Sequence, residues 1–380
     1  MTMKLVFASD SFKGSLSSTR IGELLEVEAK HAFPDATCVT LPIADGGEGT
    51  LAAIQSVRPG SLVEFVAHDG LGNPCRGGFF ACEDEAFVEA AFTCGLADVR
   101  ASERNPLRTT SFGVGECIQA ALDHGCNRIT VGLGGTCTND GGMGCLAALG
   151  VRFFDANNRE LAGCGSDLER VARIDVRGLD PRVRGVAFTV MSDVTNPLTG
   201  PYGATRVYGP QKGADAAAVE LLEMGMLHFA GMVASLYPNA NFATPGFGAA
   251  GGLGMALAVF LNARICSGIE ELLRWMDFDA IAIGADLIVT GEGQLDAQSL
   301  NGKAVGGIAQ HARQLGIPVA AICGTVAIGA DEARTLGLSR VFETSTGQSL
   351  EHALAHAEEN YLQAARKLFA SLCIKREGPF

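Results

Sequence analysis

Several turns in this chain combine glycine with residue types that do chemistry in enzymes. The clearest is the segment 132–144, GLGGTCTNDGGMG, which follows an apolar run and precedes an apolar helical pattern. Glycine lets the backbone approach a ligand closely, so this loop can aim amides and the hydroxyls of Thr136 and Thr138 at an anion. It is neither a Walker A loop nor a GxGxxG segment after an N-terminal strand. A tight connection without function is the alternative interpretation.

Two lysines stand among small residues in similar turns. Lys13 follows Asp10 and Ser11 directly after the first apolar run, and Lys212 lies in the segment GPQKG. A lysine can neutralise a phosphate or a carboxylate as a compact point charge. For each lysine, the alternative is a solvated residue in a surface loop.

Four carboxylates follow apolar runs, in turns with little structural need for an acid. They are Asp45 in ADGGEGT, Asp193 in SDVTNP, and Glu292 and Asp296 in TGEGQLD. A carboxylate can bind Mg²⁺ together with substrate phosphates and water, or accept the proton of an attacking hydroxyl. A helix N-cap is the alternative role of Asp296.

The elements that hold these turns alternate between strand and helix at both ends of the chain. This order is typical of a parallel α/β sheet, whose ligands bind at the carboxyl ends of the strands. The middle is mixed, with antiparallel strands expected at 63–66 and 79–88. We therefore predict two α/β domains, one of residues 1–62 and 286–380 and one, of residues 63–285, inserted into it. The other expected strands are 4–8, 38–43, 128–131, 185–191, 286–290 and 318–323, and the main helices are 113–124, 303–314 and 352–368.

Composition excludes several classes of protein. The net charge is −13 and no basic stripe is present, which argues against nucleic acid as a partner. The longest apolar run, 249–263, is interrupted by glycine and falls short of the roughly 20 residues of a membrane span. The 12 cysteines include no CxxC pair, and the first residues do not form a secretion signal. These features favour a reduced, cytoplasmic protein without a membrane segment.

Seven motifs in order resemble the bacterial glycerate kinase family, of the glycerate 2-kinase type. The resemblance runs from residue 4 to about residue 324, and its departures are Ser9, Cys137 and Gln294, the last standing where the family usually has an arginine. It implies a flavodoxin-like first domain and a kinase that uses ATP and Mg²⁺ to convert D-glycerate to 2-phosphoglycerate in the breakdown of organic and sugar acids. The motifs are DSFKGSLS, PIADGGEGT, GGTCTNDGG, SDVTNPLTGPYGA, GPQKGA, GFGAAGGLG and TGEGQLDAQS.

Phosphoryl transfer depends on positioning and charge neutralisation, which suggests a role for each turn. We predict that Asp193, Asp45 and Lys13 are catalytic, with Asp193 the first choice for the base. The predicted magnesium ligands are Asp45, Asp193, Glu292 and Asp296. The predicted substrate- or phosphate-binding residues are Asp10, Ser11, Lys13, Gly134, Gly135, Thr136, Thr138, Asn139, Asp140, Asn196, Lys212 and Gln298.

Three alternatives remain open at this point. One is the same chemistry at the 3-hydroxyl, or on a related hydroxy acid such as tartronate. A second is a non-catalytic sensor of small acids that keeps the pocket, and a third is a magnesium-dependent aldolase or dehydratase. The expected partners are D-glycerate and ATP, and a homodimer is possible.

Overall fold

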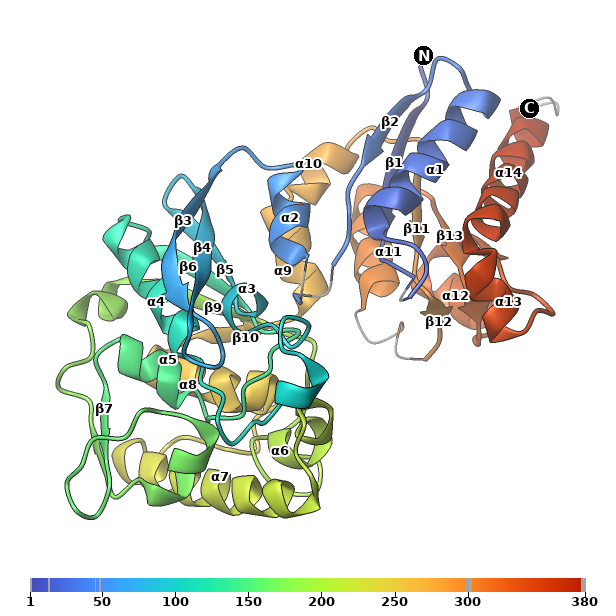
Figure 1. The fold of residues 1–380 in the computed structure, drawn as a ribbon. Coiled ribbons are helices and arrows are strands. Elements are labelled where there is room, and N and C mark those ends of the chain that lie inside the picture. Colours follow the sequence, from blue (N-terminus) through green and yellow to red (C-terminus); the bar gives the residue numbers. More distant parts are fainter. Residues whose placement is uncertain are drawn as a thin grey trace. The chain divides into compact units, whose positions relative to one another are not determined.

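A computed structural model describes residues 2–12, 14–44, 46–47, 49–297, 299 and 303–376 of the chain (Figure 1). The chain forms two compact units. The first unit contains residues 1–45, 52–58 and 267–380, and the second contains residues 46–51 and 59–266. The domain bounds expected from the sequence, 1–62 with 286–380 and 63–285, stay a prediction.

The first unit is built on a five-stranded sheet in which every neighbouring pair is parallel. Numbered along the chain within this unit, its strand order is 2-1-3-4-5, which is the flavodoxin-like order. The prediction of a flavodoxin-like parallel sheet formed by both chain ends is therefore confirmed. In spatial order the strands are β2 (Thr37–Thr40), β1 (Lys4–Ser9), β11 (Leu287–Gly291), β13 (Val319–Cys323) and β15 (Leu338–Glu343).

Helices cover both faces of this sheet (Figure 1). Alternate side chains of a strand point to opposite faces, and Phe7 and Val289 share one face with the buried residues of α1 (Ser18–Ala32) and α14 (Ala357–Arg376). The other face meets α11 (Ala304–Leu315). The remaining helices of this unit are α9 (Gly268–Trp275), α10 (Phe278–Ala282), α12 (Ala330–Leu336) and α13 (Leu350–Ala355).

The second unit contains a mixed six-stranded sheet, as the sequence predicted for the inserted part. Its first three strands along the chain are antiparallel neighbours, and the rest pair in parallel. In spatial order they are β10 (Arg264–Cys266), β9 (Ala187–Met191), β6 (Arg128–Gly132), β5 (Glu85–Glu89), β4 (Pro74–Cys82) and β3 (Ser61–His68). Strands β7 (Arg152–Phe154) and β8 (Arg173–Asp175) form a separate antiparallel pair.

The helices of the second unit pack around one large core. By length and composition alone, α7 (Ala216–Leu236) could cross a membrane, but a core helix meets the same criterion, and 39% of the most apolar window of α7 is buried. Its buried side chains include Leu222, Met226 and Phe229, and it packs on the short helix 165–170. The helices are α3 (Ala91–Cys94), α4 (Phe112–Asp123), α5 (Met143–Ala148), α6 (Ala204–Tyr208), α7 (Ala216–Leu236) and α8 (Leu253–Phe260), and α2 (Thr50–Gln55) begins in this unit's first segment.

Two predicted elements were wrong in detail. The segment 79–88, expected as one strand, contains the end of β4 and most of β5, because the chain reverses at Glu83, whose φ is 54°. This two-residue turn was not predicted from the sequence because apolar residues flank it on both sides. The helix expected at 352–368 is interrupted at His356, which ends α13 with φ −117° and ψ 23°. Strand β15 was not predicted.

Candidate active site

The glycine loop 132–144 in the second unit is fixed by its own buried acid. Asp140 is fully buried, and its carboxylate accepts hydrogen bonds from the backbone of Gly142 at 3.0 Å and of Gly144 at 3.2 Å. It also accepts from the backbone and the hydroxyl of Ser111, both at 2.7 Å. Burial raises the pKa of Asp140, and these four donors act against that rise. Both carboxylate oxygens are thus occupied in shaping the loop.

A lysine 74 residues further along the chain lies against the same loop. The ammonium of Lys212 donates to the carbonyl oxygen of Thr138 at 2.6 Å, and the side chain is only 4% exposed. Burial lowers the pKa of Lys212 to about 8, although Cys137, Asp140 and Cys94 act in the opposite direction. The alternative of a solvated loop lysine is therefore wrong for Lys212. The lysine supplies a buried positive charge to the loop.

The loop carries two neighbouring amides with no backbone acceptor among the described residues, one on the exposed Gly135 and one on the buried Thr136. Gly135 is exposed with φ 74°, and in the described part of the chain neither its N–H nor that of Thr136 donates to a backbone carbonyl. Gly134 is half-buried and donates to the carbonyl oxygen of Gly46 at 3.0 Å. An exposed amide at Gly135, on a loop that also holds a buried cation, is an arrangement suited to an anion.

Deeper in the loop, Asn139 is completely buried. Its Nδ2 donates to the hydroxyl of Thr205 at 3.1 Å, while its Oδ1 has no hydrogen-bond partner among the residues that the structure describes. Thr138 is also buried, and its hydroxyl donates to the carbonyl oxygen of Ala250 at 3.4 Å. In this structure both side chains support the loop from within.

The motif GFGAAGGLG, to which the sequence analysis gave no role, supports this loop. Ala250, Gly251 and Gly252 all have left-handed backbones, with φ of 51°, 66° and 95°. A Cβ on Gly251 would lie 2.2 Å from the carbonyl oxygen of Thr138, and the carbonyl of Gly251 accepts from Gly141 at 2.9 Å. The small residues therefore let this turn pack directly on the loop backbone.

Two glycines of the motif ADGGEGT, Gly46 and Gly47, belong to the second unit and also reach the glycine loop. A Cβ on Gly134 would lie 2.4 Å from the Cα of Gly47, which shows how closely the two backbones approach. The turn is held by Glu89 at the end of β5, whose carboxylate accepts from the amides of Gly49 at 3.2 Å and Leu51 at 2.8 Å. The sequence analysis missed Glu89, although an acid at the end of an apolar strand was the signal used elsewhere.

Asp193 follows β9 and is exposed, next to the strand β6 that leads into the glycine loop. Asn196, three residues on, uses one end of its amide within the same loop and the other end on helix α6. Its Nδ2 donates to the carbonyl oxygen of Tyr202, and its Oδ1 accepts from the hydroxyl of Tyr208, each at 2.8 Å. Asn196 thus stabilises the segment after Asp193, and Asp193 keeps an exposed position at the carboxyl edge of the sheet.

The first unit brings other predicted residues together at one end of its sheet. Asp10 and Glu292 follow β1 and β11, which are adjacent strands, and the amide of Asp10 donates to the carbonyl oxygen of Gly291 at 2.9 Å. After β1 the chain continues to β2 on one side, and after β11 it continues to β13 on the other side. The sheet edge at the ends of β1 and β11 is therefore the topological switch point, where α/β sheets bind ligands. Ser11 lies beside Asp10, and its amide donates to Asp10 Oδ1 at 2.6 Å.

Glu292 is 8% exposed and lies among charged neighbours. Burial raises its pKa, and a hydrogen bond from Ser299 at 2.5 Å acts against the rise. Asp10 and Asp296 also raise the pKa of Glu292, and Lys303 lowers it. Three predicted carboxylates thus influence one another at this edge.

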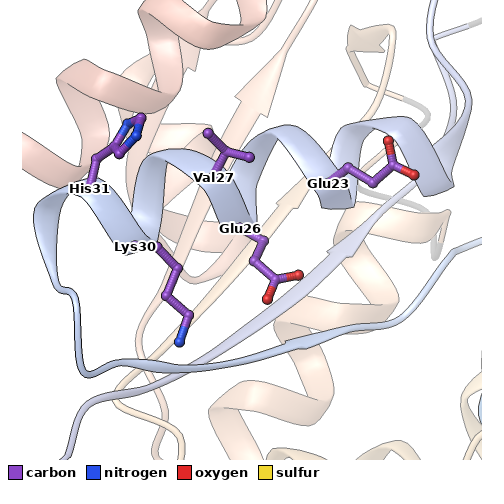
Figure 2. Close-up of a pocket in the computed structure, with 5 residues that line it drawn as sticks. All are labelled: Glu23, Glu26, Val27, Lys30 and His31. Carbon is purple, nitrogen blue, oxygen red and sulfur yellow. The ribbon is translucent and has the colours of Figure 1, made fainter.

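Three predicted site residues, Lys13, Asp45 and Gln298, lie outside the described residues. A depression of about 480 Å³ lies along α1, and none of the residues that line it is a predicted site residue (Figure 2). Figure 2 shows Glu26 and Lys30 pointing to one side of the helix and His31 to the other. None of the residues that line the depression was predicted to take part in catalysis, substrate binding or metal binding. Its lining residues are Glu23, Glu26, Val27, Lys30 and His31.

Comparisons with known proteins agree over the length of the chain. Residues 5–373 match the model of the glycerate kinase family. The chain is 42% identical over 373 residues to the glycerate kinase of Bacillus subtilis (strain 168), covering 97% of this chain and 98% of the relative. It is 39% identical to the glycerate 2-kinase of Escherichia coli (strain K12), covering 98% of each. A crystal structure of a protein described as glycerate kinase 2 from Salmonella typhimurium LT2 matches with a TM-score of 0.84 and 39% identity, over 100% of both chains.

Proposed function

The chain belongs to the glycerate kinase family, a family of phosphotransferases, and we propose that it transfers the γ-phosphoryl group of ATP to the 2-hydroxyl of D-glycerate. We also propose that the enzyme is cytoplasmic and acts in the breakdown of organic acids. The observation that carries the proposal of phosphoryl transfer is the buried Lys212 ammonium against a glycine loop whose exposed Gly135 has an amide without a backbone acceptor in the described part of the chain. Both substrates are anions, and the protein itself has a net charge of −13, so anion binding needs a local positive site.

In the second unit, the proposed role of the loop is to bind an anionic group of substrate or nucleotide. The amide of the exposed Gly135 is available as a donor, and the charge of Lys212 adds a positive field at the same loop in a low-dielectric environment. Asp140, Thr138 and Asn139 hold the loop in this shape. Preorganised donors stabilise charge without reorganising during the reaction.

The proposed base is Asp193, because it is exposed and stands at the carboxyl end of β9. A base must be within hydrogen-bond reach of the hydroxyl that attacks, and a carboxylate can accept the proton of that hydroxyl. Asp193 would hold the proton as the glycerate oxygen attacks phosphorus. Lys13 and Asp45 keep their proposed catalytic roles.

In the first unit, the donors fit magnesium held by one or two carboxylates. Glu292, with Asp10 and Asp296 near it, offers hard oxygen ligands, which Mg²⁺ prefers. Within the described residues, no three His, Cys, Asp or Glu side chains form a metal cluster by themselves. That agrees with the usual magnesium site of phosphotransferases, where the nucleotide and water complete the coordination. Bound magnesium would neutralise charge on the phosphates of ATP.

The test is an assay with ATP, Mg²⁺ and D-glycerate. We expect ADP release that depends on glycerate, and a phosphorus NMR signal of 2-phosphoglycerate. A signal of the 3-isomer would show the alternative regiochemistry, and turnover of tartronate in preference to glycerate would show a related hydroxy acid as substrate. No ADP release with any of these acids would contradict the proposal.

A further inference from the structure

Ser299 is a buried serine beside Glu292, at the sheet edge of the first unit where we propose magnesium binding. The sequence analysis gave Ser299 no role. It is completely buried, and its hydroxyl donates to Glu292 Oε1 at 2.5 Å. The hydroxyl oxygen of Ser299 accepts from the amide of Asp296 at 3.1 Å, and the amide of Ser299 donates to the carbonyl oxygen of Asp296 at 3.0 Å. One hydroxyl therefore links two of the predicted metal ligands.

We propose that Ser299 is a positioning residue that fixes which oxygen of Glu292 is available to a cation. The proposal rests on the proposed function, because it takes Glu292 as a metal ligand. A carboxylate that rotates about its last torsion exchanges its two oxygens. With Oε1 accepting from Ser299, rotation breaks a short, charge-assisted hydrogen bond, so Oε2 is kept as the free ligand atom.

The backbone around Glu292 supports the same orientation. The carbonyl oxygen of Glu292 accepts from the amide of Gly324 at 3.1 Å, which joins the residue to the end of β13. Strands β12 (Gln294–Leu295) and β14 (Thr325–Val326) pair immediately after it. The hydrogen bond from Gly324 thus holds the main chain of Glu292, and the hydrogen bond from Ser299 holds its carboxylate. A ligand held at both points loses little conformational freedom when a metal binds.

Hydrogen bonds to metal-binding carboxylates have a known scale of effect. Removing such a partner costs about 10- to 100-fold in metal affinity or activity. For Ser299→Ala we therefore expect an affinity for Mn²⁺, used as a spectroscopic probe of the magnesium site, about tenfold below that of the wild type. We also expect a higher KM for Mg²⁺ with an unchanged KM for D-glycerate.

The experiment measures Mn²⁺ binding to the whole protein by electron paramagnetic resonance, with steady-state kinetics in parallel. Ser299→Thr keeps a hydroxyl and should restore Mn²⁺ affinity to within about twofold, which separates positioning from simple packing. Ser371→Ala is the matched control, because Ser371 is half-buried in the same unit and its hydroxyl donates only to the carbonyl oxygen of Leu368, at 2.6 Å. This control should bind Mn²⁺ like the wild type.

Glu292→Gln distinguishes failure of this inference from failure of the proposed function. If Glu292→Gln binds Mn²⁺ weakly and Ser299→Ala binds it normally, Ser299 does not position the ligand and the inference is wrong. If Glu292→Gln itself binds Mn²⁺ normally, Glu292 is not a metal ligand, and both that proposed role and the inference about Ser299 are wrong. In the supporting outcome, adding Ser299→Ala to Glu292→Gln weakens binding little further, since the two residues act as one unit.

Discussion

The ammonium of Lys212 lies 2.6 Å from the carbonyl oxygen of Thr138, in a buried position beside the glycine loop. Few lysines are buried to this extent without a carboxylate in direct contact. The lysine lowers the stability of the fold at neutral pH, because burial penalises its charged form. Retaining such a residue is consistent with a role in binding anions.

Replacing Lys212 with methionine should separate function from stability. We expect turnover to fall by roughly 100-fold or more, because the loop loses its buried charge. The free energy of unfolding at pH 7 should stay the same or rise. Urea unfolding and the coupled ADP assay measure the two effects, with Lys367→Met, at an exposed position of α14, as the control.

The pH dependence of stability provides a second readout for Lys212. Its pKa is about 8 in the folded protein and 10.5 as an ordinary lysine, so the unfolded chain binds the proton more tightly. The contribution of Lys212 to the free energy of unfolding should therefore be lowest below pH 8 and rise between pH 8 and 10.5. Lys212→Met should lack this rise, and an identical pH profile in both proteins would contradict the assignment.

The turn at 250–252 predicts a contrast between adjacent positions. Gly251→Ala should destabilise the protein by about 1–3 kcal/mol or more, because φ is 66° and the new Cβ would meet the carbonyl of Thr138. Ala250→Gly should change stability by less than about 1 kcal/mol, since glycine adopts the same left-handed backbone without strain. Thermal unfolding measures both. Equal losses in the two variants would show that the backbone conformation is not the cause.

Asp193→Asn should lower turnover by about 10²- to 10⁴-fold while leaving the fold intact, since the amide cannot accept the hydroxyl proton. Steady-state kinetics and circular dichroism check the two parts of this prediction. Asp331→Asn, at an exposed residue of α12, is the control and should turn over normally. Near-wild-type turnover in Asp193→Asn would remove Asp193 from the mechanism.

His311 links three helices of the first unit. It contacts Asp279 at 2.7 Å and Glu270 at 3.2 Å; burial lowers its pKa, but these two carboxylates outweigh burial and raise it above 6.5. Its stabilising contribution should be fully present below pH 6.5 and disappear as the pH rises through the folded pKa. His311→Gln should therefore lower the urea midpoint more at pH 5.5 than at pH 9. An equal loss at both values would show that charge is not involved.

The sequence predicted the parallel sheet and its turns because strand periodicity and polar strand ends are local features. Asp10 and Glu292 could be placed at one sheet edge by that rule alone. The burial of Lys212 could not be predicted, since it depends on a contact with Thr138, 74 residues away. The sequence also did not predict that Asp140 holds the shape of its own loop, because one of the residues that donate hydrogen bonds to it, Ser111, lies outside that loop.

The sheet of the first unit has a consequence for how the chain folds. Strand β1 pairs with β2 on one side and with β11 on the other, and 246 residues separate the end of β2 at Thr40 from the start of β11 at Leu287. At about 5–20 residues per second, a ribosome needs roughly 12–50 s to make that stretch. Throughout that time an apolar edge of β1 has no strand to cover it. Nascent chains of this protein should therefore depend on chaperones more than their final stability suggests.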